Sequence, residues 1–479
     1  MPHTTINIQN SPISHVKLTL NDTNLTVQNF TRSKPATRHD IGFRFILHAT
    51  FDDSSRMKLA YLAKKKELHL VVLEGTVDEA DIRHAAEWAK SVMTAVYEDN
   101  GIQRSRRFMV FVNPFGGKKK GASIFVNKVE PVLKIAGCSL EVLYTTHQGQ
   151  AQELAKNLPL DFDAIVIVSG DGLIHEILNG FAEHADPMKA FSIPIAPIPT
   201  GSGNGLSLNI LGPEEGFDVL AAALNAIKGQ PMKVDVFSVT QGGRRSISFM
   251  SQALGLMADL DIGTDNLRWM GETRFLYGLL RGLVKYKSCP VQLSYKVAEK
   301  DKLKMAVEVS LRKNTLGLHS PTSASTQAGF SDTLPPLKYV KRDEQEDEEG
   351  WTTFTDPILY VYAGKGPYVG RDYMAFPVSL PDDGLIDLVV MTNDSRGDLI
   401  SAMDGAPQGN TYWHPKVHYV KAHTYRVKPL QEKGHLAIDG ERYPFEEFQV
   451  EVYKGLATLM SPYGHYAAHF EPRTPTDTP

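Results

Sequence analysis

The sequence predicts an α/β protein in which a parallel sheet covered by helices is followed by an antiparallel β-sandwich. From Arg107 to about residue 228, short apolar runs alternate with stretches of helical periodicity. This alternation is typical of a parallel sheet whose strands are connected by helices. After residue 229, strand-like runs follow one another with few helical stretches between them, which favours an antiparallel sandwich.

The composition is that of ordinary globular domains. The chain has 479 residues, of which 42% are hydrophobic and 22% charged, and a formal net charge of -4. This length allows two or three domains, and the charge gives no general attraction for nucleic acid. Only Cys138 and Cys289 are present, which excludes a disulfide framework and favours a reducing compartment.

Neither the N-terminal stretch nor any apolar run predicts membrane insertion. The first residues lack the basic and apolar regions of a secretory signal. No apolar run approaches the ~18 residues of a membrane span. We therefore expect a cytoplasmic protein that associates peripherally with intracellular or plasma membranes.

Residues 1–102 are predicted to form an accessory module. Residues 1–40 are polar and give weak signals, so we expect them to be partly disordered. Residues 42–51 and 68–77 read as strands, and residues 77–99 carry the periodicity of a helix. Strands followed by one helix resemble a pleckstrin-homology-like unit.

Residues 103–228 are predicted to form the parallel-sheet domain. Pro131 is expected to bend or restart the first of its helices. Strands should begin at Arg107, Cys138, Asp163 and Ile193, with helices over 122–137, 147–158 and 173–181. Ligands of such sheets bind at the carboxyl ends of the strands.

Residues 229–479 are predicted to form the sandwich, and one of its strands is expected at Met305–Lys313. Residues 313–353 are poor in core residues and end in an acidic run. We interpret them as a solvated, disordered insertion, either a passive linker or a regulatory segment.

Three glycine turns at predicted strand ends suggest a phosphate site. Asn113–Gly121 and Pro199–Gly205 offer backbone N–H groups to anions, and Lys118–Lys120 add positive charge. The third turn presents Asp171 between two glycines. Phosphate donors beside a carboxylate suit phosphoryl transfer. Taken alone, each turn is also compatible with a plain strand–turn–helix junction.

The same turns carry a family resemblance. In order and spacing they resemble the catalytic domain of the diacylglycerol kinase/sphingosine kinase superfamily, over most of residues 105–465. The matching stretches read NPFGGKKKG, SGDGLIHEILNG, PTGSGNG, PDDGLIDLVVM and AIDGERYPFEEFQVEV. The resemblance implies an NAD kinase/diacylglycerol kinase-like three-layer domain followed by a lipid-binding sandwich. It also implies ATP as cofactor, and Mg²⁺ is expected only as the ion that accompanies ATP. The histidines His414, His418 and His423 lack the spacing of metal ligands, so no structural metal is expected.

Residues 251–275 are similar to the substrate segment of sphingosine kinases, here of the fungal type with an extra N-terminal module. The similarity implies that Asp261 recognises the amino and hydroxyl head of the lipid, while Arg268 and Arg274 reach the nucleotide phosphates. A carboxylate is a natural partner for the ammonium of a long-chain base. The alternative is that Asp261 only caps a helix beginning near Asn266.

Further site residues are implied by the resemblance. Phe115 departs from the family, which often has Arg at this position, and Gln148 stands where a basic residue can occur. The residues implied to contact the nucleotide are Asn113, Pro114, Phe115, Thr145, Gly149, Ser169, Glu176, Gly201, Ser202, Gly203, Asp439, Gly440 and Glu441. Those implied to lie beside the substrate are Ser169, Gly170, Asp171, Gly172 and Ser251.

The predicted function is an ATP-dependent lipid kinase that phosphorylates the primary hydroxyl of sphingosine-like long-chain bases, with Asp171 as general base. Ceramide or diacylglycerol kinases are the nearest alternatives, but their head groups would leave Asp261 without a cationic partner. An NAD kinase would need no alkyl pocket. A non-catalytic lipid sensor would not need the intact turn at Asp171.

Overall fold

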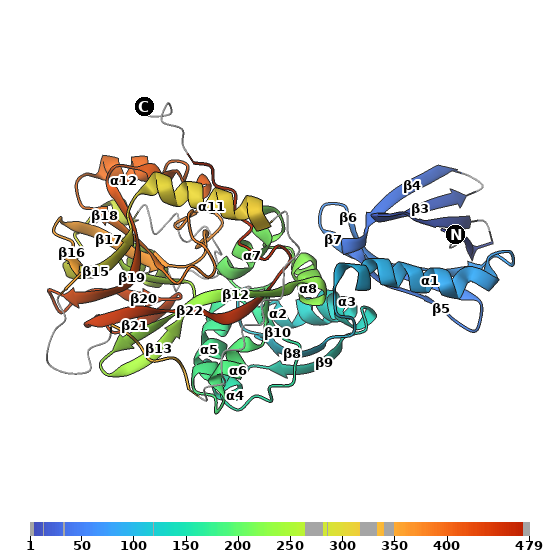
Figure 1. Cartoon of the computed structure of the whole chain (residues 1–479), viewed down its shortest axis with the longest axis horizontal. Helices are drawn as coiled ribbons and strands as arrows, with labels where there is room; N and C mark the ends of the chain where they lie inside the picture. The colour runs from blue at the N-terminus through green and yellow to red at the C-terminus, as the bar shows by residue number, and fades with distance from the viewer. Residues whose placement is uncertain are drawn as a thin grey trace.

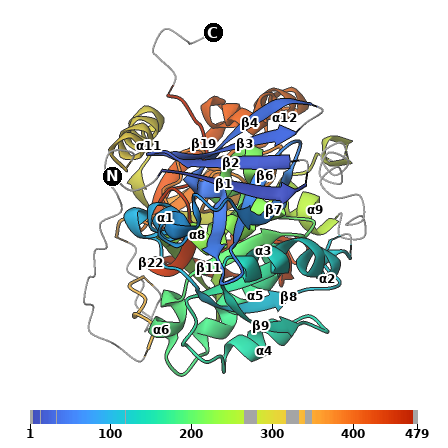
Figure 2. The same cartoon turned by 90° about the vertical axis from the view of Figure 1, so that its right-hand side faces the viewer.

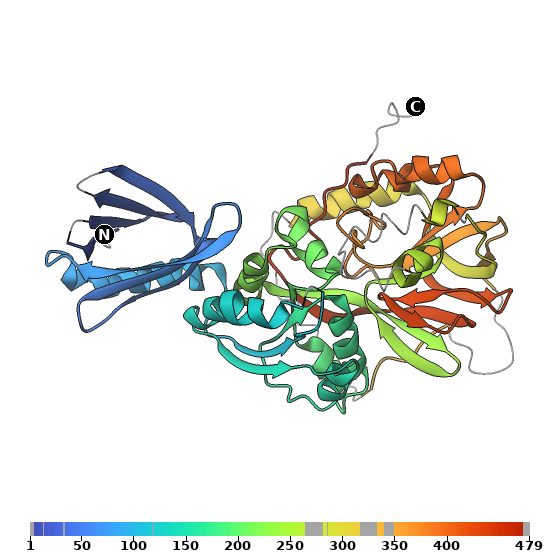
Figure 3. The same cartoon turned by 180° about the vertical axis from the view of Figure 1, so that it is seen from behind.

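The computed structural model describes residues 4–12, 14–31, 34–117, 119–263, 281–284, 286–316, 333–339 and 349–472. A small N-terminal module projects from a larger body that holds the rest of the chain, and helices α3 and α8 lie near the junction (Figure 1 and Figure 3). No helix in these ranges is long and apolar enough to cross a membrane.

The N-terminal module is an antiparallel sheet in the order β4-β3-β2-β1-β7-β6-β5, with helix α1 (Ile82–Val96) lying across it (Figure 2). The helix buries Ala85, Trp88, Ala89 and Val92 at helical spacing. The strands are β1 (Thr5–Ser11), β2 (Ser14–Leu20), β3 (Asn24–Thr31), β4 (Lys34–Gly42), β5 (Ile46–Phe51), β6 (Arg56–Lys64) and β7 (Leu68–Val77).

The expectation of partial disorder over residues 1–40 was wrong for the described residues, since they form strands β1 to β3 and most of β4. Ile6 and Ile8, and likewise Val16 and Leu18, are fully buried at a spacing of two residues. That spacing places each pair on one face of its strand. The many polar residues in these strands made the alternation of apolar residues difficult to recognise in the sequence.

The central domain is a parallel sheet in the order β11-β10-β8-β9. Helices α2, α3 and α8 cover one face, and α4, α5 and α6 cover the other. Pro131 lies in the first turn of α3, where the helix restarts after a π-helical turn, as the sequence predicted. The elements are β8 (Arg107–Val112), α2 (Gly121–Ile124), α3 (Glu130–Ile135), β9 (Ser139–Tyr144), α4 (Gln150–Ala155), β10 (Ala164–Ser169), α5 (Asp171–Ala182), α6 (Pro187–Ser192), β11 (Ile195–Pro199), α7 (Gly205–Glu215) and α8 (Val219–Lys228).

The C-terminal part is strand-rich and continuous with the central sheet. Strand β22 pairs parallel to β11 at Leu459↔Ile195 and antiparallel to β12, so the last strand joins both parts. Strands of this part enclose one apolar cluster. They are β12 (Gln230–Gln241), β13 (Arg244–Ser248), β14 (Ser251–Gly255), β15 (Val291–Glu299), β16 (Thr352–Thr353), β17 (Ile358–Gly364), β18 (Ile386–Thr392), β19 (Val417–Pro429), β20 (Leu436–Ile438), β21 (Glu441–Tyr443) and β22 (Phe448–Ser461).

Among the described residues, the strands are accompanied by helices α9 (Leu256–Asp261), α11 (Lys302–Leu316) and α12 (Arg396–Met403). The strand expected at 305–313 was wrong, because these residues belong to α11. Met305, Ala306 and Val309 are buried, which is helical spacing. Met305, Val307, Val309 and Leu311 alternate in the sequence and imitate a strand.

Parts of the predicted insertion at 313–353 are bound to the sandwich. Leu337 is buried, and the N–H groups of Lys338 and Tyr339 donate to the Glu451 carboxylate at 2.6 and 2.9 Å. Thr352–Thr353 pairs with β15. The expectation of a solvated, disordered loop was therefore wrong for these stretches.

Candidate active site

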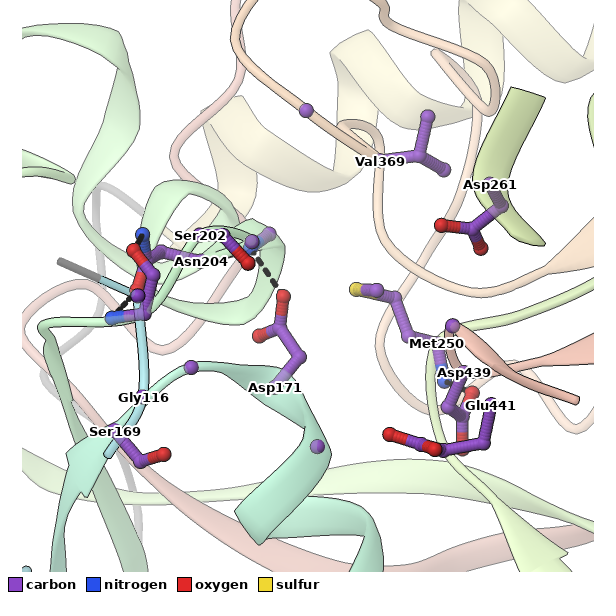
Figure 4. Close-up of a pocket in the computed structure, with 18 of the residues that line it drawn as sticks. Gly116, Ser169, Asp171, Ser202, Asn204, Met250, Asp261, Val369, Asp439 and Glu441 are labelled. Atoms are coloured by element: carbon purple, nitrogen blue, oxygen red, sulfur yellow. Dashed lines mark hydrogen bonds between the residues drawn. The ribbon is translucent and has the colours of Figure 1, made fainter. Parts of the chain in front are cut away.

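A cavity of about 1210 Å³ lies at the carboxyl ends of β8, β10 and β11. The glycine turns of the central domain line one side, and β14, α9 and the β20–β21 turn line the other. The carboxylates of Asp171 and Asp261 both face into this space (Figure 4). Strand topology therefore brings the predicted chemistry to one place, as expected for parallel sheets.

The glycines hold two of the turns in direct contact. A Cβ atom on Gly170 would lie 2.5 Å from the Gly203 carbonyl oxygen, and one on Gly201 would lie 2.2 Å from the Cα of Gly170. No side chain fits at either position. The Asp171 turn and the Pro199–Gly205 turn therefore pack backbone against backbone.

Asp171 opens helix α5 and points towards the start of helix α7. Its Oδ2 accepts the Gly205 N–H at 2.7 Å (Figure 4). Its Oδ1 accepts the Leu206 N–H at 3.2 Å. Burial raises the pKa of Asp171 to about 6, with the charges of Asp439 and Asp261 acting in the same direction and the two N–H groups opposing them. The carboxylate is thus ionised at neutral pH but more basic than an exposed aspartate.

Two asparagines shape the turns that face the cavity. The Asn113 Oδ1 accepts the N–H groups of Phe115 and Gly116 at 2.9 and 3.1 Å. Asn204 closes the other turn through two hydrogen bonds of 3.0 Å with the backbone of Gly201. These side chains organise the loops.

Asp439 is a buried anchor between the two halves of the site. Its carboxylate accepts hydrogen bonds of 2.8–3.1 Å from the Ser248 hydroxyl and the N–H groups of residues 249–251. His175 Nδ1 lies 2.8 Å from Asp439 Oδ2. Both oxygens are thus bound by the protein, and Asp439 fixes the segment that leads into Ser251.

His175 connects this anchor to helix α5, on which it lies one turn after Asp171. Its Nε2 is 3.3 Å from the Tyr443 hydroxyl. Burial acts to lower the pKa of His175, but the hydrogen bond to Asp439 and the nearby charges of Asp439 and Glu441 outweigh it, so the pKa is raised. The contact between His175 and Asp439 therefore joins the two halves.

Glu176 and Glu441 line the cavity beside Gly172. The Glu176 Oε2 accepts the Ala151 N–H at 3.1 Å, and the Glu441 Oε2 accepts from Gln148 Nε2 at 3.1 Å. Gln148, which stands where a basic residue can occur in the family, thus pairs with an acidic residue.

The opposite side of the cavity places Asp261 beside apolar side chains. Asp261 ends α9, and its Oδ2 lies 3.7 Å from where a Cβ on Gly440 would be. Ser251 starts the adjoining strand β14. The apolar lining consists of Phe217, Met250, Met257, Leu260, Tyr362, Val369, Tyr373, Met403, Ala406 and Pro407.

The structure brings most of the predicted site residues to the cavity. Pro114 and Gly149 are outside its lining, and Arg268 and Arg274 lie outside the described residues. The predicted residues that line it are Asn113, Phe115, Thr145, Ser169, Gly170, Asp171, Gly172, Glu176, Gly201, Ser202, Gly203, Ser251, Asp261, Asp439, Gly440 and Glu441. Within the described ranges, no group of three His, Cys, Asp or Glu side chains is placed to hold a metal ion.

Sequence reasoning missed the loop Val369–Tyr373, which contributes Arg371 and two bulky side chains to the lining. It also missed the N–H groups of Gly205 and Leu206 as partners of Asp171. Gly205 belongs to a recognised glycine turn, whereas the loop carries no pattern that distinguishes it from other surface turns.

Comparisons with known proteins agree with this arrangement. Residues 107–239 match the diacylglycerol kinase catalytic domain, and residues 344–460 match the YegS C-terminal NAD kinase beta sandwich-like domain. A diacylglycerol kinase structure from Bacillus anthracis superposes with a TM-score of 0.50 at 18% identity, covering 74% of this chain and 97% of that one. The predicted fold class is thereby confirmed.

Relatives of known activity cover most of the chain. It is 32% identical to "Sphingoid long chain base kinase 4" of Schizosaccharomyces pombe, over 88% of this chain and 88% of that protein. It is 29% identical to "Sphingosine kinase 1" of Arabidopsis thaliana, over 75% of this chain and 76% of that protein. The chain therefore belongs to the sphingoid long-chain base kinase family, whose members are ATP-using lipid kinases.

Proposed function

We propose that the protein phosphorylates the primary hydroxyl of a long-chain base, with Asp171 accepting the proton and Asp261 binding the ammonium group. In this scheme residues 103–228 bind ATP, residues 229–479 bind the lipid, and residues 1–102 form an accessory module. The observation that carries the proposal is that Asp171 lies beside the glycine turns and Asp261 beside the apolar lining of the same cavity.

Asp171 is suited to the role of general base. With a pKa of about 6 it is ionised at neutral pH, and a base with a pKa near the working pH is efficient. The hydroxyl proton passes to Asp171 as the hydroxyl oxygen attacks the γ-phosphorus. The bond from that phosphorus to the bridging oxygen breaks, and ADP leaves.

The glycine turns and Lys119 line the half of the cavity that would take the phosphates. Turns at the starts of helices and a lysine favour anions there. Glu176 and Glu441 are the carboxylates that would hold Mg²⁺, which prefers oxygen ligands and binds with the phosphates. When bound, Mg²⁺ neutralises phosphate charge. In this proposal Asp439 positions its neighbours, because its own oxygens are occupied.

Asp261 favours an amine-bearing lipid over ceramide or diacylglycerol. Those lipids carry no ammonium group, so their head groups would offer the Asp261 carboxylate no charge-assisted hydrogen bond. A long-chain base supplies that partner through a charge-assisted hydrogen bond.

An acceptor panel tests the proposal. We expect purified protein to transfer phosphate from ATP to sphingosine, and to ceramide and diacylglycerol far more slowly. Asp171→Asn should reduce turnover roughly 100- to 10,000-fold, whereas Asp259→Asn, at an exposed neighbour of the site, should not. Ceramide or diacylglycerol as the better acceptor would contradict the substrate assignment.

We also propose that contact with the membrane is peripheral. Val284 and Ile400 are 78% and 59% exposed, and α12, which carries Ile400, also supplies Met403 to the cavity. Glu substitutions at Val284 and Ile400 should reduce liposome flotation. Phe30→Glu, on an exposed apolar residue of the N-terminal module, is the matched control. Equal flotation of all three variants would refute this surface.

A further inference from the structure

Asn209 is a buried asparagine of helix α7 that the proposed chemistry does not use. The residue is 1% exposed and lies outside the cavity lining. On the same helix, about one turn earlier, the N–H groups of Gly205 and Leu206 bind Asp171. A buried amide group costs free energy unless it is hydrogen-bonded, so the partners of Asn209 indicate its role.

Both polar atoms of the Asn209 side chain bind the main chain of Tyr368. The Nδ2 donates to the Tyr368 carbonyl oxygen at 2.8 Å, and the Tyr368 N–H donates to Oδ1 at 2.7 Å. The side chain thus exchanges two hydrogen bonds with Tyr368, as a residue of a neighbouring antiparallel strand would. Tyr368 directly precedes the loop Val369–Tyr373, which lines the cavity.

The chain that leads into this loop is shaped around the same contact. Gly366 has a φ of 89°, and a Cβ atom there would lie 2.5 Å from Asn209 Nδ2, so glycine is required at this position. Its N–H donates to the Ser379 hydroxyl at 2.9 Å. The preceding residue, Lys365, is buried and paired with the carboxylates of Asp235 and Asp383. The loop therefore starts from a fixed point.

Helix α7 lies between this loop and Asp171. A Cβ atom on Gly205 would be 3.4 Å from the Val369 carbonyl oxygen and 3.6 Å from Asp171 Oδ2. Val369 and Asp171 both line the cavity (Figure 4). Because Gly205 and Asn209 belong to one helix, that helix sets the position of the carboxylate and of the loop.

We propose that Asn209 is a positioning residue for phosphoryl transfer. Through Tyr368 it fixes the loop Val369–Tyr373 relative to Asp171, so that an acceptor held against the loop presents its hydroxyl to the carboxylate. The inference rests on the proposed role of Asp171 as general base. A base must lie within hydrogen-bond reach of the proton that it accepts, and a misplacement of about 1 Å can cost about 100-fold in rate.

The test is Asn209→Leu in the full chain. Leucine has the branched shape of asparagine without its polar atoms, so Tyr368 loses both hydrogen bonds while the volume is nearly kept. We expect kcat/KM for sphingosine to fall about 10- to 100-fold, with the affinity for a fluorescent ATP analogue unchanged. Gly366→Ala disturbs the same contact from the side of the loop and should have the same effect. It decides the question if Asn209→Leu does not fold.

Asn225→Leu is the matched control. Asn225 is a buried residue of helix α8, and its Nδ2 donates to the Met460 carbonyl oxygen at 2.9 Å. It therefore also ties a helix to the main chain of another segment, but both residues lie outside the cavity lining. Its substitution should lower the melting temperature, because a buried carbonyl loses its donor, and leave kcat/KM at the wild-type value.

The outcomes separate positioning from stability. A loss of kcat/KM in Asn209→Leu and Gly366→Ala that is absent from Asn225→Leu supports the inference. A lower melting temperature with wild-type kcat/KM in Asn209→Leu overturns it, and so does a loss of ATP affinity as large as the loss of kcat/KM. If wild-type protein did not phosphorylate sphingosine, the proposed function would be refuted and this inference with it.

Discussion

At the scale of single residues, Asp171 shows how local structure sets chemistry. Burial disfavours its charged form, while two N–H groups at the start of α7 favour it. The balance is a pKa of about 6. An exposed aspartate would be a weaker base, and a buried one without these donors would be protonated at neutral pH.

This balance predicts an acid limb in the pH profile. Because only ionised Asp171 accepts the proton, kcat/KM should fall as the pH drops through about 6, by about tenfold between pH 7 and pH 5. The substrate ammonium stays protonated over this range. The measurement is kcat/KM against pH, with circular dichroism at pH 5 to verify folding.

The residual activity of Asp171→Asn should lack this limb. A wild-type profile that is flat between pH 5 and pH 7 would show that Asp171 is not the titrating base.

At the scale of elements, Asp439 joins α5, β14 and β20. It receives donors from residues 248–251 and from His175, and is almost completely buried. Its backbone has a φ of 50°, so the hydrogen bonds offset a strained conformation. The segment before Ser251 depends on this carboxylate for its shape.

Asp439→Asn should therefore destabilise the protein. The amide keeps the volume but presents an NH₂ group to N–H donors, which leaves buried groups unpaired and costs about 2–4 kcal/mol. Urea unfolding measures the loss, and Asp404→Asn, at an exposed position after α12, is the control. Equal stability of both variants would mean that the anchor is dispensable.

Helices and strands whose apolar residues follow one clear pattern could be predicted from the sequence. Those whose apolar residues fit both a helix and a strand could not. The central strands are continuous apolar runs, and β8, β10 and β11 were found where expected. Helix α11 was misread because its residues alternate like a strand while burying Met305, Ala306 and Val309. This segment is helical because those three side chains pack against the sandwich. Such tertiary contacts cannot be read from the order of apolar and polar residues in the segment itself.

The same distinction applies to the site. Asp171 and the glycine turns could be predicted, because close backbone approach requires glycine at fixed positions. Tyr362 and Tyr373 could not, since strand β17 and the loop after it meet only in the folded chain. Nothing in the spacing of two tyrosines eleven residues apart indicates a shared cavity wall.

At the scale of the whole molecule, the N-terminal module is docked through buried polar contacts. Arg44 pairs with Glu215, and Lys228 Nζ donates to the Phe43 carbonyl at 2.7 Å and lies 4.8 Å from the Tyr97 ring centroid. Burial, followed by the charge of Arg44, lowers the pKa of Lys228 to about 7. At the contact between the module and helix α8, the folded structure therefore destabilises the charged form of Lys228.

Lys228 predicts a specific pH dependence of stability. Because its pKa is lower in the folded than in the unfolded protein, its charge penalises folding at pH 7, and the penalty shrinks as the pH rises towards 10.5. The melting temperature of wild type should therefore gain more between pH 7 and pH 9 than that of Lys228→Met.

The full penalty is at most about 5 kcal/mol. Lys90→Met, at an exposed lysine of helix α1, should behave as wild type. If the melting temperature of Lys228→Met rose between pH 7 and pH 9 as much as that of wild type, Lys228 would not be the cause of the increase.

The proposed mechanism assigns the proton to Asp171 and the ammonium group to Asp261, in one cavity. Asp261 is the residue that determines which lipid is accepted. Asp261→Asn keeps the size and removes the charge, so the amide can still hydrogen-bond a hydroxyl but cannot neutralise an ammonium. The most direct measurement is kcat/KM for sphingosine and for uncharged N-acetylsphingosine, in wild type and in Asp261→Asn.

We expect kcat/KM for sphingosine to fall about 10- to 150-fold, the value of a charge-assisted hydrogen bond. The small activity towards N-acetylsphingosine should change much less, and ATP binding should be preserved. Equal losses for the charged and the uncharged acceptor would contradict the assignment of Asp261 to the ammonium group.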